Sequence, residues 1–144
     1  MTETLTTDMT LAQHLARFAA DTTFDDLPDD VVSSVGMRVL DTVGIAIADT
    51  DLDTSRAAIA WADEQGGAAT AFAVGVKAGL PAPMAAFVNG VLAHSLDFDD
   101  THLPSILHPS ACVVPAALAV AQQHDADGKA LVRKGVAMAH AALH

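Results

Sequence analysis

The chain has 144 residues, of which 51% are hydrophobic and only 4% aromatic, and its formal charge at pH 7 is −11. A hydrophobic share of this size predicts a folded domain with its own core, and scarce aromatics mean that alanine and valine fill much of it. Seven basic residues against 18 acidic ones argue against nucleic acid and an anionic membrane surface as partners, because both attract clustered Lys and Arg. An acidic surface is typical of a soluble protein or of adaptation to high salt.

The single cysteine and the N-terminal residues limit the chemistry and the compartment. Cys112 alone excludes an internal disulfide and an iron–sulfur cluster held by this chain, and its apolar neighbours lead us to expect it in the core. Residues 1–10 lack the basic and apolar segments of a secretory signal. We find no apolar run of the roughly 18–20 residues needed to cross a bilayer, and we expect a cytoplasmic protein without membrane contact.

Helical periodicity runs through nearly the whole chain and predicts an all-α bundle of about six helices. Thr10 and Gln13 form a capping box for the first helix. A second helix is expected over residues 28–48. Its buried stripe is expected at Val32, Val35, Val39, Leu40, Val43 and Ile47.

Four further segments follow in the same way. Asp53 is the expected N-cap of a third helix, which Gly66 and Gly67 end after Gln65. Residues 70–76 suit either a strand or an extended connector. Helices are expected over residues 81–92 and 109–123, the latter irregular because of Pro115, and from residue 128 onward. This last helix has no glycine or proline terminator, so we expect it to belong to a longer chain.

Residues 94–108, between the fourth and fifth helices, contain three aspartates and three histidines. Loops held by rigid helices concentrate functional groups, and residues 108–110 stand at a helix start, where free N–H groups favour an anion. Residue chemistry alone leaves open local capping, a metal site or acid–base chemistry on a small carboxylate. Two patterns are weaker: His124-Asp125 as a phosphohydrolase pair, and residues 97–100 (DFDD) as the acid motif of class II terpene cyclases.

Three segments carry a family resemblance. Residues 86–101 (AFVNGVLAHSLDFDDT), followed by residues 108–110 (HPS), resemble the signature region of the MmgE/PrpD family, and residues 38–44 (RVLDTVG) resemble its second-helix pattern. The family includes 2-methylcitrate dehydratase, cis-aconitate decarboxylase and iminodisuccinate epimerase. The resemblance implies one large helical domain, spanning all 144 residues here, paired with a smaller α+β lid domain. It also implies a homodimer that acts on a small polycarboxylate and needs no metal or other cofactor.

The resemblance also implies which residues form the site. Three are expected to be catalytic: Asp97, Thr101 and His108. Three more are expected to bind the substrate: Asp100, His102 and Ser110. A histidine works as an acid or base near neutral pH, which suits His108; Thr101 would hold a carboxylate oxygen, and Asp97 would orient a histidine or hold a substrate hydroxyl.

The chain also departs from the family pattern. The lysine, histidine and tyrosine elements of the lid side have no counterpart here, and residues 138–140 (MAH) replace the usual Gly-Tyr-Glu turn. We therefore expect a truncated chain or a disrupted reading frame. No basic residue lies within residues 94–110, so we expect the cations that pair with a polycarboxylate to come from elsewhere in a longer chain or from another subunit. The rival hypothesis is a non-catalytic helical domain that dimerises or binds a partner.

Overall fold

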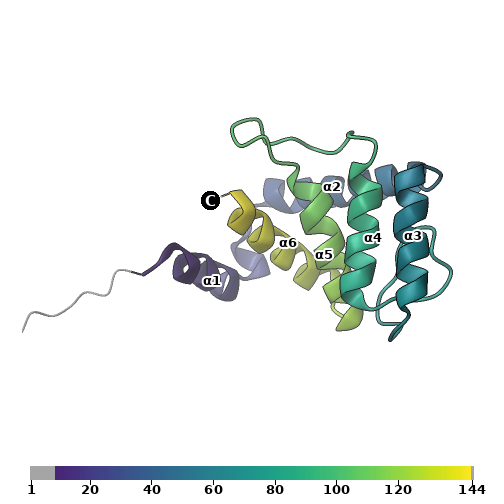
Figure 1. The fold of residues 1–144 in the computed structure, drawn as a ribbon. Helices are drawn as coiled ribbons and strands as arrows, with labels where there is room; N and C mark the ends of the chain where they lie inside the picture. The colour runs from purple at the N-terminus through teal and green to yellow at the C-terminus, as the bar shows by residue number, and fades with distance from the viewer. Residues whose placement is uncertain (1–8, 144) are drawn as a thin grey trace, which may run out of the picture.

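The computed structural model describes residues 9–143, with side chains as far as residue 137, and within this range it is all-α with no named strand (Figure 1). The all-α prediction is therefore confirmed. Six α-helices and one short 3₁₀ helix follow one another along the described chain. They are α1 (Leu11–Asp21), η1 (Phe24–Asp26), α2 (Asp29–Ala48), α3 (Asp53–Gln65), α4 (Ala82–His94), α5 (Pro109–Gln123) and α6 (Gly128–Leu143).

The helix boundaries largely follow the local signals in the sequence. The predicted capping box is present: Thr10 N–H donates to Gln13 Oε1 at 2.8 Å, and Gln13 N–H donates to Thr10 Oγ1 at 3.3 Å. Gly66 ends α3 with φ of 61°, a conformation that glycine adopts without strain. The predicted N-cap of α3 is wrong by one residue, because Asp53 is the first helical residue and Leu52 is the cap.

Residues 70–76 form an extended connector with one bridge. Ala71 and Leu80 exchange backbone hydrogen bonds of 2.9 and 2.8 Å in an isolated antiparallel bridge. The side chain of Asn89 on α4 then fixes the connector, accepting from Val74 N–H at 2.9 Å and donating to the Phe72 carbonyl at 3.1 Å. The connector is thus tied to α4 just below the loop that leaves this helix.

Helix α4 is the centre of the bundle. It packs against α5, α3 and α2, while α5 also packs against α6, and α1 lies against α6 (Figure 1). A Cβ added at Gly90 would lie 3.3 Å from the carbonyl oxygen of Ala111, so α4 and α5 approach closely at this point. Small side chains dominate the core, as predicted: Ala46, Ala62, Ala71, Ala73, Leu80, Ala82, Ala85, Val88, Leu92 and Ala119. The tight α4–α5 pair holds both ends of the loop between them.

Helix α2 corrects two expectations. Leu40 and Ile47, predicted to be buried, are 68% and 59% exposed, and Thr42, Ile45 and Ala46 are the buried residues of this helix. The other four predicted residues, Val32, Val35, Val39 and Val43, are half-buried, so the predicted face is right in part. The helix has 20 residues, and an 18-residue window within it has a mean hydropathy of 1.6, so by length and composition it is also apolar enough to cross a membrane and our count of apolar runs was wrong. Core helices of soluble proteins meet the same criterion.

The C-terminal helix lies at the edge of the described range. The backbone of residues 138–140 is helical within α6, while their side chains and His144 lie outside what the structure describes. The uncapped helix end expected at His144 stays a prediction.

Candidate active site

The loop between α4 and α5 carries the candidate site and projects beyond the ends of both helices (Figure 1). His94 is the last residue of α4, and His108 is the N-cap residue of α5. The close packing of these helices brings the two imidazole rings to a centroid distance of 4.9 Å in an edge-to-face arrangement. Two histidines that are 14 positions apart thus form one pair at the base of the loop.

Asp99 lies between these two histidines and is buried. Its side chain is 1% exposed, and its two carboxylate oxygens are 3.0 and 3.1 Å from His94 Nδ1. The distance from Asp99 Oδ1 to His108 Nδ1 is 3.4 Å. A buried carboxylate must be hydrogen-bonded or neutralised, and the two imidazoles are the groups beside Asp99 that meet this need. Asp99 therefore hydrogen-bonds the His94 ring and lies within ion-pair distance of the His108 ring.

Asp97 approaches His108 from the other side of its ring. The distance from Asp97 Oδ1 to His108 Nε2 is 3.9 Å, and the Asp97 side chain is 77% exposed. Its φ of 56° is left-handed, a conformation that aspartate tolerates better than most residues. His108 thus has a buried carboxylate near Nδ1 and an exposed one near Nε2.

A cavity of about 710 Å³ opens beside the histidine pair. Both histidines line it, together with apolar residues of α4 and α5 that include Phe87 and Val91. Cys112 also lines it and is exposed, so the expectation that this thiol lies in the core is wrong. A cavity of this size with a few polar groups at one end suits a small organic ligand.

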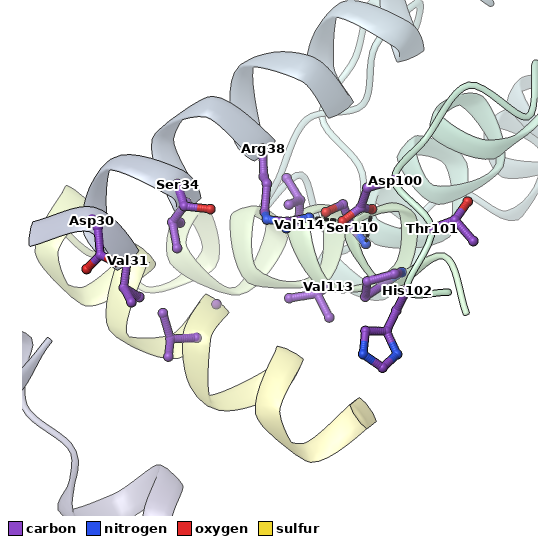
Figure 2. A pocket seen from close by; sticks show the side chains of 14 residues that line it. Asp30, Val31, Ser34, Arg38, Asp100, Thr101, His102, Ser110, Val113 and Val114 are labelled. Carbon is purple, nitrogen blue, oxygen red and sulfur yellow. Dashed lines mark hydrogen bonds and ion pairs between the residues drawn. The ribbon is translucent and has the colours of Figure 1, made fainter. Parts of the chain in front are cut away.

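A second group forms around Asp100, next to the first. Ser110 N–H donates to Asp100 Oδ1 at 3.0 Å, and Arg38 on α2 makes an ion pair with Asp100 Oδ2. Figure 2 shows the Arg38 side chain reaching from α2 to Asp100 and Ser110. Asp100 therefore caps the start of α5 and is itself neutralised by Arg38.

This arrangement bears on two expectations about charge. Although residues 94–110 contain no cation, α2 brings Arg38 to the loop, so at least one positive group comes from within the chain. The N–H of Ser110 was expected to be free for an anion, but Asp100 already accepts from it. Substrate binding at this helix start would first have to displace the Asp100 carboxylate.

The other two predicted residues lie on the Arg38 side of the loop. Thr101 is exposed, and with His102 it lines a cavity of about 540 Å³ that also contains Arg38 and Asp100 (Figure 2). His102 Nδ1 lies 2.7 Å from Ser105 Oγ, within the loop itself. The structure thus brings Asp97 to His108, and places Thr101 in the neighbouring cavity. The two cavities share one lining residue, Pro109.

The chain matches the MmgE/PrpD N-terminal domain over residues 13–142, so it belongs to the MmgE/PrpD family. Human cis-aconitate decarboxylase is 56% identical over 43 residues, and the mouse enzyme of the same name is 54% identical over 43 residues. Each match covers 30% of this chain and 9% of the relative. The family thus includes enzymes that act on carboxylic acids, while the short matched segment leaves the activity of this protein to be proposed.

Proposed function

We propose that this domain forms one side of an active site that moves a proton at a carbon next to a carboxylate of a small polycarboxylic acid. One observation carries the proposal: His108 lies at the base of the loop with Asp99 3.4 Å from Nδ1 and Asp97 3.9 Å from Nε2. An imidazole that a buried carboxylate orients and that remains accessible at its other nitrogen is the arrangement of a general acid–base group.

The roles of the surrounding residues follow from their positions. Asp99 orients His108, and Asp97 lies where it would accept a hydrogen bond from a substrate hydroxyl or from Nε2. Thr101 offers a hydroxyl at the neighbouring cavity, where Arg38 supplies positive charge. Arg38 is already paired with Asp100. One guanidinium cannot neutralise Asp100 and the several carboxylates of a polycarboxylate substrate at the same time. We therefore propose that further cations come from residues beyond this domain or from a second subunit.

The comparisons favour a lyase. Both curated relatives are cis-aconitate decarboxylases, and 2-methylcitrate dehydratase is the activity that we propose from the resemblance in the sequence. Dehydration, decarboxylation and epimerisation of such acids share proton transfer next to a carboxylate, so one histidine serves each of them.

Binding to a protein that contains this domain together with the residues that complete the site tests the proposal. The protein is titrated with 2-methylcitrate or cis-aconitate while the NMR signals of the histidine rings are recorded. We expect the signals of His108 to shift and those of His124 to stay unchanged. His124 is the matched control because it is exposed at the far end of the same helix, α5. Equal shifts of both histidines, or none at millimolar acid, would contradict the proposal and favour a helical domain that only binds a partner chain.

A further inference from the structure

We propose that His94, Asp97, Asp99 and His108 also form a binding site for a divalent transition-metal ion such as Zn²⁺, and that an ion bound there blocks the acid–base role of His108. Each of the four residues offers a ligand atom, and these atoms all lie within 4.8 Å of one another. Imidazole nitrogen and carboxylate oxygen are the ligand types that suit Zn²⁺.

The distances support His94, Asp99 and His108 as close ligands of the ion and Asp97 as a more distant ligand at the edge of the site. In a tetrahedral Zn²⁺ site with bonds of roughly 2.0–2.1 Å, ligand atoms lie about 3.3 Å apart. The Asp99 oxygens are 3.0 to 3.1 Å from His94 Nδ1, and Oδ1 is 3.4 Å from His108 Nδ1, close to that spacing. Asp97 is the more distant ligand, because its carboxylate approaches the opposite nitrogen of His108.

A buried nitrogen without a hydrogen-bond partner lies at the same place. The Nδ1 of His108 is buried and has no hydrogen-bond partner, and it faces the buried carboxylate of Asp99 at a distance longer than an ordinary hydrogen bond. A cation between these two atoms would give His108 Nδ1 a partner and would also bind the Asp99 carboxylate. Asp97 and Asp99 together carry two negative charges, and the ion pair that Arg38 makes is with Asp100 instead. A divalent ion with two neutral imidazoles would therefore leave the site without net charge.

The consequence for the proposed function is competition. A metal ion on His108 Nδ1 draws electron density from the ring and takes Asp99 away from its orienting role, so the histidine no longer exchanges protons with a substrate. We therefore expect turnover to need no metal, to persist after dialysis against a chelator, and to be inhibited by micromolar Zn²⁺. This part rests on the proposed function, whereas metal binding itself does not.

The experiment measures binding directly on the whole chain. Isothermal titration with Zn²⁺ is expected to show one ion per chain, and Co²⁺ is expected to give the strong visible absorption of a tetrahedral nitrogen and oxygen site. Residues that only support ligands are already worth about 10–100-fold in metal affinity, so His94→Ala should weaken Zn²⁺ binding by at least about tenfold. His124→Ala, at the far end of α5, should bind as the unmodified chain does.

Each result decides the matter. One-to-one binding that His94→Ala weakens and His124→Ala does not supports the site, and the Co²⁺ spectrum of the unmodified chain supports it without any variant. Binding weaker than about millimolar, or equal loss in both variants with helical content intact, overturns it. Metal binding without any substrate-induced shift of His108 would uphold this site and contradict the proposed function, so the two can fail separately.

Discussion

Asp99 Oδ1 lies 3.0 Å from Nδ1 of His94 and 3.4 Å from Nδ1 of His108, so one buried carboxylate orients two imidazoles from the ends of two helices. The sequence has three aspartates within four residues of this loop, and the structure shows that the middle one is buried.

Replacing this carboxylate tests its positioning role. In an active protein that contains this domain, Asp99→Asn should lower kcat by about 10²-fold or more with little change in KM, because the amide keeps the shape and loses the charge that favours the productive ring orientation. Steady-state kinetics provide the measurement, with the exposed Asp51→Asn as control. A change confined to KM would show that Asp99 does not orient the acid–base group.

The Asp100 cluster predicts an asymmetry in stability. Asp100→Ala removes the acceptor of Ser110 N–H at the start of α5, and loss of such a cap costs about 0.5–2 kcal/mol. Arg38→Ala removes only the ion pair, whose arginine side chain is 50% exposed, and pairs of this kind contribute about 0–1 kcal/mol. Urea denaturation should therefore show the larger loss for Asp100→Ala. An equal or larger loss for Arg38→Ala would contradict the capping role.

Two glycines give opposite predictions for the same substitution. At Gly67, φ is 117° and a Cβ would lie 2.6 Å from Pro81 Cγ, so Gly67→Ala should destabilise the fold by about 1–3 kcal/mol. At Gly36, inside α2, a Cβ would meet nothing within 4 Å, so Gly36→Ala should stabilise by about 0.5–1 kcal/mol. Thermal unfolding of both variants checks the pair. A stabilising Gly67→Ala would show that the α3–α4 connection differs from that described.

The exposed face of α2 predicts self-association. Met37, Leu40 and Ile47 are 64%, 68% and 59% exposed. Exposed apolar side chains on one face of a helix are typical of a surface that packs against another chain. The purified chain should therefore sediment as a species larger than 14.8 kDa, and Leu40→Lys should shift it toward the monomer.

Vesicle flotation distinguishes self-association through α2 from binding of α2 to a membrane. Because α2 also has the length and hydropathy of a membrane helix, the chain should be tested with neutral and anionic vesicles and is expected to stay with the soluble fraction. A monomer in sedimentation, or a chain that floats with the vesicles, would contradict the expectation of a dimer.

Much of the fold follows from local signals in the sequence. The capping box at Thr10, the glycines after α3 and the proline before α4 all mark the expected helix ends, because each acts on its own neighbours. Burial along α2 followed only in part, since Leu40 and Ile47 are exposed while the smaller Ala46 is buried. Which face of an apolar helix meets its neighbours depends on partners that are distant in sequence.

The candidate site was also predicted from local sequence signals only in part. The sequence placed the chemistry on the loop between the fourth and fifth helices, but singled out Asp97 and passed over Asp99 and His94. The relevant signal was present, since His94 ends a helix that packs against the one beginning at His108. Arg38 could not be assigned from spacing, because it lies 62 positions from Asp100 and reaches it only through the packing of α2.

The most direct test of the account is the kinetic effect of removing the His108 imidazole. In an active protein that contains this domain, His108→Ala should lower kcat/KM for its polycarboxylate substrate by about 10²-fold or more, as expected for loss of a general acid–base group. The matched control His124→Ala, on the same helix, should remain within twofold of the unmodified enzyme. A kcat/KM for His108→Ala that is also within twofold, in a folded variant, would contradict the proposed role of this site.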